Sequence, residues 1–422
     1  MRNGLRYGSL LIAGLALGGC ELDFTDPNNP TEPTVLGDPQ NLMSVAVGLQ
    51  AEMANAMGSF IYTTSLIASE TGVGTATFAN FVAADAGDQL EGGQFLSEEP
   101  WQIRYRVVKL ADDLLGAAPG ANLRAGTRSG ILALAKLARA KSFGELIQLY
   151  PTIPIVVGIA NRHPPFVDRA AVLTEALRLL NEARQDIITT PLSDEFLNTV
   201  LAPGFDLPNT IDAMIARYSL IAGDLTGALA AAGRVNLSVI SEFRHSTNDP
   251  NSVRNLMYTS GNAWQMRPRQ ELRLQAEAGD QRAAFWVTAA NVAGANGRTL
   301  DELARYTTAD APFPVYLPDE MRLIMAEVHA RQNNLGQART LINAVRTQCG
   351  VSTEPAACLP ALPDAQLDTQ AEVLAEILHQ RRYELFLQGV RQEDLRRFGA
   401  AMKYEYVPYP GTECARNQNA PC

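Results

Sequence analysis

Apolar residues recur at helical spacing through most of the first half of the chain. The pattern predicts helices over residues 41–57, resuming over 61–69, and then over 101–115, 131–149 and 170–187. Asp168 stands directly before the last of these, where its side chain can cap the helix. Residues 71–97 are rich in Gly, Thr and Ala and follow no such period, so we expect a loop there.

Two later segments share one spacing of small and apolar residues. In residues 213–232, Ala216 is followed by Leu220, Gly223, Leu225 and Ala228; in residues 321–345, Ala326 is followed at the same offsets by Ala330, Asn333, Leu335 and Ala338. Alanines let two helices approach closely, and Gly223 or Asn333 can take the left-handed conformation that ends the first helix. Each segment is predicted to be a helical hairpin. The spacing resembles the tetratricopeptide repeat, which buries its apolar face only when stacked on neighbours.

The region between the two hairpins differs from both. Residues 238–318 contain clusters of Asn, Asp, Ser, Gly and Pro with scattered aromatic residues and little sustained period. Long irregular insertions on a rigid scaffold commonly carry binding sites. We therefore predict an all-α fold of tetratricopeptide-like hairpins over residues 39–422, forming a single domain. It would hold a long loop-rich insertion that faces the ligand and few short strands.

A final amphipathic segment, residues 377–399, is predicted to be one largely buried helix. Its apolar residues Tyr383, Phe386, Leu387 and Val390 have the spacing of one helical face. It also carries four charges, Arg381, Glu384, Arg391 and Asp394. Arg381 with Glu384, and Arg391 with Asp394, have i,i+3 spacing and could pair on the helix surface. The alternative is that these charges form an ordinary solvated stripe.

The overall composition narrows the classes of function. Hydrophobic residues make up 46% and charged residues 19% of the chain, as is ordinary for a folded protein. The formal net charge of -10 disfavours a nucleic acid as partner, because phosphate binding needs a basic surface.

The N-terminus has the pattern of an export signal. Arg2 and Arg6 precede a short apolar run over residues 10–17, and Leu17-Gly18-Gly19-Cys20 follows. This tetrapeptide resembles a bacterial lipobox, and the resemblance implies that residues 1–19 are removed and that Cys20 is lipidated. The apolar run is too short for the alternative, a transmembrane helix, which takes about 20 residues. Residues 20–38, rich in Pro, Asn and Asp, are predicted to be a tether.

Four further cysteines agree with an oxidising compartment. Cys349 and Cys358, and Cys414 and Cys422, form two pairs that are close in sequence. Three connectivities are possible, and local pairing closes the shortest loops. A zinc site is the alternative, but these cysteines lack CxxC spacing and have no histidine beside them. No metal or other cofactor is expected.

The C-terminal charges also carry a family resemblance. The succession Arg381, Glu384-Leu385, Gly389, Arg391, Asp394-Leu395 and Arg397 resembles the C-terminal signature of the SusD/RagB family of outer-membrane nutrient-binding lipoproteins. Residues 101–115, 137–155 and 279–282 also resemble family segments. The chain departs from the family at Gln380 and Gln388, where Glu is usual, which puts the signature's ion-pair network in doubt.

The resemblance implies a function. A member of this family would lie on the cell surface, attached to the outer membrane through its lipid, and Glu21 after the cysteine favours that membrane. It would bind an oligosaccharide or another oligomeric nutrient, such as a peptide, and pass it to a SusC-like TonB-dependent transporter. No catalysis is expected. Within this picture we interpret Arg381, Glu384, Gly389, Arg391 and Asp394 as framework residues.

Candidate ligand residues follow from sugar chemistry, because sugars stack on aromatic rings and hydrogen-bond to polar side chains. Two groups in the insertion and one pair in the early loop have this composition: Asn262, Trp264, Gln265 and Arg267; Asp280, Arg282 and Trp286; Phe78 and Phe81. The alternative for Trp264 and Trp286 is that each closes the core beneath the insertion.

Two other classes of function stay open. A tetratricopeptide adaptor would bind a protein in a concave groove. An exported helical glycosidase would need two carboxylates across a cleft, and acid pairs such as Asp301-Glu302 and Asp319-Glu320 exist. The four histidines are scattered and match no hydrolase motif.

Overall fold

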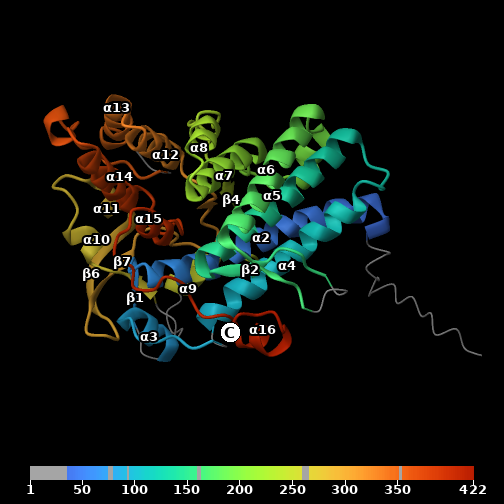
Figure 1. Ribbon diagram of the computed structural model, residues 1–422, viewed down its shortest axis with the longest axis horizontal. Helices are drawn as coiled ribbons and strands as arrows, with labels where there is room; N and C mark the ends of the chain where they lie inside the picture. The colour runs from blue at the N-terminus through green and yellow to red at the C-terminus, as the bar shows by residue number, and fades with distance from the viewer. Residues whose placement is uncertain (1–35, 75–78, 93–94, 159–162, 259–265, 351–353) are drawn as a thin grey trace, which may run out of the picture.

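The protein is built mainly from helices (Figure 1). The structure is a computed structural model that describes residues 36–74, 79–92, 95–158, 163–258, 266–350 and 354–422. The helices are α2 (Pro39–Ile67), α3 (Ala79–Ala86), α4 (Phe95–Ala117), α5 (Ala125–Leu149), α6 (Arg169–Thr189), α7 (Leu207–Ala222), α8 (Leu225–Ala232), α9 (Ser252–Tyr258), α10 (Glu271–Leu274), α11 (Gln281–Trp286), α12 (Pro318–Arg331), α13 (Leu335–Arg346), α14 (Gln370–Glu384), α15 (Arg391–Arg397) and α16 (Gly411–Arg416). The all-α prediction is confirmed.

The strands are short and pair antiparallel in twos. They are β1 (Thr71–Val73) with β5 (Met266–Pro268), β2 (Thr152–Pro154) with β3 (Phe166–Asp168), β4 (Glu242–Phe243) with β8 (Phe313–Pro314), and β6 (Val287–Ala293) with β7 (Thr299–Leu303). Five of these strands lie in the insertion. That region is therefore less irregular than the sequence predicts.

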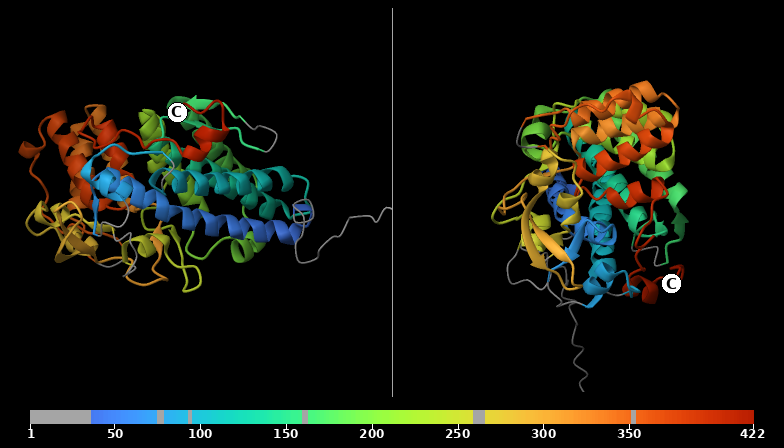
Figure 2. Two further views of the ribbon diagram at one scale, coloured as in Figure 1. Left: turned by 90° about the horizontal axis from the view of Figure 1, so that it is seen from below. Right: turned by 90° about the vertical axis from the view of Figure 1, so that its left-hand side faces the viewer.

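Helix α2 is the long central element, and α4 runs beside it along the molecule (Figure 2). Its first turn is capped by the Asp38 carboxylate, which accepts from the backbone N–H groups of Gln40 and Asn41. The predicted break before residue 61 is wrong. Gly58 lies inside the helix, and its Cβ position is only 2.7 Å from Ser252 Cβ, so a glycine is needed for α9 to approach α2. The glycine marks close packing and not a helix end.

The two predicted hairpins are α7–α8 and α12–α13. Gly223 and Asn333 end their first helices with φ of 83° and 60°, the left-handed conformation expected at these positions. From α4 to α8 each helix packs on the next, and α12 packs on both α8 and α14. The hairpins therefore bury their apolar faces against neighbours, as tetratricopeptide-like units do.

The C-terminal signature is not one continuous helix. Helix α14 ends at Glu384, and a turn with Leu387 at φ 58° and Gly389 at φ 71° leads into α15. A Cβ on Gly389 would lie 2.5 Å from the Phe60 ring of α2. The turn presents its apolar residues to α2, which is why the sequence pattern reads as an unbroken buried helix.

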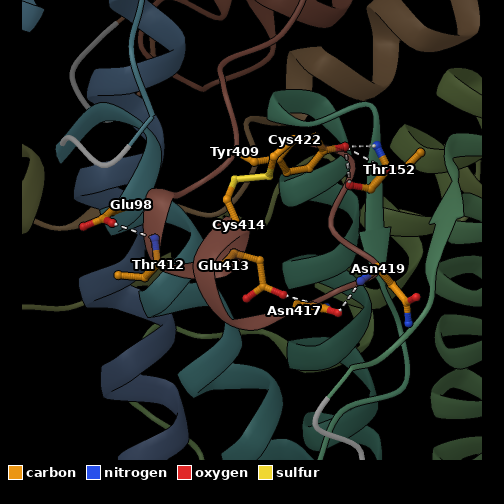
Figure 3. The surroundings of a disulfide bond; sticks show 9 residues. All are labelled: Glu98, Thr152, Tyr409, Thr412, Glu413, Cys414, Asn417, Asn419 and Cys422. Carbon is orange, nitrogen blue, oxygen red and sulfur yellow. Dashed lines mark hydrogen bonds between the residues drawn. A yellow bond between two sulfur atoms is a disulfide. The ribbon is translucent and has the colours of Figure 1, made fainter.

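Both disulfides join neighbouring cysteines, Cys349 with Cys358 and Cys414 with Cys422. Figure 3 shows the second, next to Tyr409 and the β2 residue Thr152. The Tyr409 hydroxyl accepts from the backbone N–H of Thr152 at 3.1 Å and donates to its carbonyl at 3.1 Å. The C-terminal segment is thus attached to β2 as well as closed on itself.

None of the described helices combines the length and the hydropathy needed to cross a lipid bilayer. The predicted signal peptide, Cys20 and most of the tether lie outside the described residues.

Candidate functional site

The strand pair β1–β5 joins the two segments that the sequence predicts to carry the ligand site. Thr71 pairs with Pro268 and Val73 with Met266. Because the strands are antiparallel, the early loop leaves β1 at the same end of the ladder at which the insertion enters β5. Four of the predicted ligand residues, Phe78, Asn262, Trp264 and Gln265, belong to these two connections and lie outside the described residues.

The β6–β7 hairpin covers the same end of the ladder. Ala295 donates its N–H to the carbonyl of Val73 at 2.8 Å, and the Asn296 side chain donates to the carbonyl of Val82 at 3.0 Å. The early loop, β5 and the hairpin thus form one continuous surface, which we call the loop surface. Its described residues are 71–74, 79–92, 266–269 and 287–303.

Asp85 of α3 holds the loop surface together. Its carboxylate accepts from the N–H of Val73 at 3.2 Å, from the Asn296 side chain at 3.3 Å, and from the guanidinium of Arg269. The residue is fully buried, and its ion pair with Arg269 is also buried. Each of the three segments therefore has a direct bond to one carboxylate.

Arg267 is the predicted ligand residue that the structure places on the loop surface. Its guanidinium pairs with Glu302 of β7 at 3.0 Å, and the two side chains are 20% and 51% exposed. A ligand on this surface can therefore reach both partners. Phe81, in contrast, is 2% exposed and packs between Tyr62 and Phe95, with ring centroids 5.7 and 5.9 Å away. It supports the loop and offers no face to a ligand.

The second predicted group, Asp280, Arg282 and Trp286, lies in the core and does not fit a ligand site. Asp280 caps α11 and pairs with Arg282, and Arg282 also pairs with Glu384 at 3.4 Å. The Trp286 ring is 1% exposed and its Nε1–H donates to the carbonyl of Tyr383 at 2.8 Å. For Trp286 the alternative interpretation, closure of the core beneath the insertion, is the one that the structure shows.

The signature charges pair mainly between helices, and one pair, Asp394 with Arg397, lies within α15. Arg381 pairs with Asp394 at 2.9 Å, and Asp394 also pairs with Arg397, which in turn pairs with Glu327 of α12. Both predicted i,i+3 pairs are therefore wrong. Each predicted pair lies within one helix, α14 or α15, but the turn at residues 385–390 brings Asp394 to Arg381, and packing brings Arg282 to Glu384.

The environment of these charges sets their protonation. Burial opposes ionisation of Asp394, but Arg381 and Arg397 hold its pKa below the ordinary value. For Glu384, burial and the nearby charge of Asp319 raise the pKa well above the ordinary value in spite of Arg282. The solvated-stripe alternative is wrong for Arg381, Glu384 and Asp394, which are at most 3% exposed, whereas Arg391 is partly exposed.

A cavity of about 240 Å³ lies at the other end of the β1–β5 ladder and was not predicted. Glu70, which precedes β1, and Arg269, which follows β5, both line it, together with residues of α10, α14, α15 and the C-terminal segment. In the sequence, the charge-rich signature was the one signal that could have indicated this cavity, since its arginines Arg382 and Arg391 line it. Lys403 is a single charge shortly after the signature, and Glu70 is a single charge far from it in sequence.

Comparison with known protein families finds a match over the C-terminal part of the chain. The SusD family model matches residues 257–421, which include the signature and most of the insertion. The C-terminal part of the chain, residues 257–421, is thus similar to the SusD family. No curated protein sequence matches the chain.

Solved structures of similar fold extend the agreement in fold to nearly the whole chain. A SusD-like carbohydrate-binding protein from Bacteroides vulgatus is 15% identical with a TM-score of 0.70, covering 91% of this chain and 98% of that one. A laminarin-binding SusD-like protein is 17% identical with a TM-score of 0.67, covering 90% and 98%. A SusD superfamily protein from Bacteroides thetaiotaomicron is 13% identical with a TM-score of 0.71, again covering 90% and 98%. At these identities the likeness establishes the shared fold.

Proposed function

We propose that this protein binds an oligosaccharide, or another oligomeric nutrient such as a peptide, and delivers it to a SusC-like TonB-dependent transporter. The observation that carries the proposal is the β1–β5 ladder. It brings the ends of the Gly-rich early loop and of the Asn262–Arg267 segment to one place, and these are the segments with the composition of a sugar site.

The chemistry of the loop surface supports a sugar ligand. Trp264 and Gln265 are the two residues before β5 in sequence, Asn262 lies two residues before Trp264, and the partly exposed Arg267–Glu302 pair lies on the surface. Aromatic rings contact the C–H faces of sugars, while amides and charged groups bond to hydroxyls. Two structural relatives are named as carbohydrate-binding and laminarin-binding proteins, so a glycan is the first ligand class to test.

We expect binding without chemical change of the ligand. Three carboxylates of the loop surface, Asp85, Asp301 and Glu302, are each engaged by an arginine, Arg269, Arg273 and Arg267 respectively, and the other two, Asp88 and Glu91, are exposed to water. A glycosidase needs one carboxyl group that can donate a proton and another that can act as nucleophile or base. Carboxylates held in arginine ion pairs suit binding better than proton transfer.

Lipidation of Cys20 would keep the loop surface close to a transporter in the outer membrane. Acyl chains anchor stably because each buried methylene contributes about 0.8 kcal/mol. We expect Cys20→Ala to move the protein from the membrane fraction to the soluble fraction. Recovery of the lipidated protein from solubilised outer membrane without any transporter partner would count against delivery.

The decisive test of ligand binding is calorimetric titration of the detergent-solubilised full-length protein. The ligands are laminari-oligosaccharides, malto-oligosaccharides and a mixture of oligopeptides. We expect one class to bind, and Trp264→Ala to weaken that binding about tenfold, because a lost stacking contact costs about 1.5 kcal/mol. Leu274→Ala is the control, since Leu274 is a 61% exposed apolar residue of the same insertion. Absence of binding, or equal affinity in Trp264→Ala, would contradict the proposal.

A further inference from the structure

The cavity at the far end of the β1–β5 ladder is chemically distinct from the loop surface. It is enclosed by residues that follow α2, by α10, by α14 and α15, and by the segment around Lys403 (Figure 1). Its volume of about 240 Å³ is below the range of about 300–1,000 Å³ of drug-sized pockets. It can therefore hold a small molecule and not an oligosaccharide.

Three cations, Arg382, Arg391 and Lys403, line this cavity. Within the part of the chain that the structure describes, Arg382, Arg391 and Lys403 form no ion pair. Each donates to a neutral acceptor instead: Arg382 to the Gln275 side chain at 2.8 Å, Arg391 to a backbone carbonyl at 3.5 Å, and Lys403 to a backbone carbonyl at 3.3 Å. Positive charges removed from water normally have a paired anion.

Two carboxyl groups that line the cavity, those of Glu70 and Glu271, can accept further hydrogen bonds. Glu70 is 8% exposed; its Oε1 accepts from the N–H of Leu387 at 3.4 Å, and its Oε2 has no partner among the described residues. Glu271 Oε2 is likewise buried without a described partner. Buried polar atoms in folded proteins are nearly always hydrogen-bonded. These two oxygens therefore indicate a ligand in the cavity that donates hydrogen bonds to them.

The balance of charge in the cavity is positive. Burial raises the pKa of Glu70 to about 7, although Arg391 acts in the opposite direction. Burial and the neighbouring Arg269 lower the pKa of Lys403 to about 7. The two arginines stay charged at neutral pH, so an anion is the ligand that this lining favours.

We propose that the cavity binds a small hydroxy-carboxylate. The carboxylate would lie among Arg382, Arg391 and Lys403, and the hydroxyl groups would donate to Glu70 and Glu271. The Phe386 ring, which also lines the cavity, would contact the C–H groups of the ligand. A phosphate dianion fits less well, because its second charge would face the two carboxyl groups.

This ligand class includes sugar acids and simple hydroxy acids, which share the recognised groups. The site is separate from the loop surface and does not depend on the nutrient that binds there. Arg391, interpreted from the sequence as framework alone, would take part in binding.

The test is calorimetric titration of the full-length protein in detergent with glucuronate, lactate, glucose and inorganic phosphate. We expect glucuronate to bind and glucose to give no signal. Binding of lactate as well would show that the hydroxy-carboxylate is sufficient, whereas binding of glucuronate alone would show that the sugar ring is also required. Either result supports the proposal.

Matched variants locate the binding. Arg382→Gln and Lys403→Gln should each weaken glucuronate binding about tenfold, because a charge-assisted hydrogen bond is lost. Arg124→Gln removes the same charge from a side chain that is 75% exposed and distant from the cavity lining, and it should bind as the parent does. If Trp264→Ala also leaves glucuronate binding unchanged, glucuronate does not bind on the loop surface.

Three results would overturn the proposal: no binding of either carboxylate, binding of phosphate alone, or unchanged affinity in both Arg382→Gln and Lys403→Gln. Thermal unfolding of each variant verifies that it is folded. If one of the two does not fold, the other variant decides alone. Loss of oligosaccharide binding with retained glucuronate binding would contradict only the proposed nutrient site.

Discussion

The two ends of the β1–β5 ladder differ in chemistry although three residue pairs separate them. At the Val73–Met266 end the chain continues into loops whose sequence is rich in glycine, aromatic and amide residues. At the Thr71–Pro268 end it meets a cavity lined by buried charges. Stacking contacts are insensitive to salt, whereas charge pairing weakens as salt screens it. One short ladder can therefore position two binding surfaces that respond differently to solution conditions.

The largest expected effect comes from removing the residue that connects both ends. Asp85→Asn leaves the buried Arg269 guanidinium without its anion, and loss of one partner of a buried ion pair costs about 3 kcal/mol. We expect the free energy of unfolding in urea to fall by this amount and both ligands to bind more weakly. Asp88→Asn, an exposed position next to α3, is the control. Unchanged stability in Asp85→Asn would show that the two ends do not depend on this carboxylate.

A smaller effect is expected at the cavity end alone. Gly389→Ala forces a side chain into the left-handed region and against the Phe60 ring, which together cost about 2 kcal/mol. Glucuronate binding should weaken, because the same turn supplies the Leu387 N–H to Glu70. Oligosaccharide binding should be unchanged in the folded fraction.

Gly336→Ala is the matched control for that substitution. Gly336 lies in α13, has nothing within 4 Å of its Cβ position, and should gain slightly in stability because alanine favours a helix. If Gly389→Ala is as stable as Gly336→Ala in thermal unfolding, the turn does not constrain the cavity.

The smallest expected effect is a change in pH dependence. The pKa of Glu70 is about 7 in the folded protein, above its ordinary value, so the folded state binds the proton more tightly than the unfolded state does. This contribution to stability is complete below about pH 4.5 and is lost as the pH rises through 7. The Glu70→Gln variant lacks this contribution to stability. Between pH 5 and pH 8 its melting temperature should therefore fall by about 2 °C less than that of the parent. The exposed Glu91→Gln serves as control, and identical profiles would show that Glu70 is ionised throughout.

Local pattern was sufficient to predict much of the helical scaffold. The tetratricopeptide-like hairpins depend on small residues and on a left-handed residue at Gly223 and Asn333, and these are properties of neighbouring positions in the sequence. The Asp168 cap and the two local cysteine pairs follow from nearest neighbours in the same way. Such features are decided within a few residues, which is why periodicity and spacing predict them.

Local pattern could not predict which charged residues form ion pairs with each other. Arg381 has Glu384 one turn away, yet the turn at residues 385–390 places Asp394 closer to its guanidinium, and Glu384 pairs with Arg282, about one hundred residues earlier. Asp280-Arg282-Trp286 and Asn262–Arg267 have similar composition, but long-range packing buries the first group. Composition shows what a segment can bind and does not show whether the fold leaves it accessible.

The attachment of the C-terminal segment has a consequence for how the chain folds. Val407 donates its N–H to the carbonyl of Leu149, and the Tyr404 hydroxyl donates to the carbonyl of Ala83. Helices made early in synthesis are therefore completed by residues made last, and such non-local contacts slow folding because a long loop must close first. The early helices therefore stay without these contacts until the C-terminal residues have been made, and they must be protected from aggregation during that time.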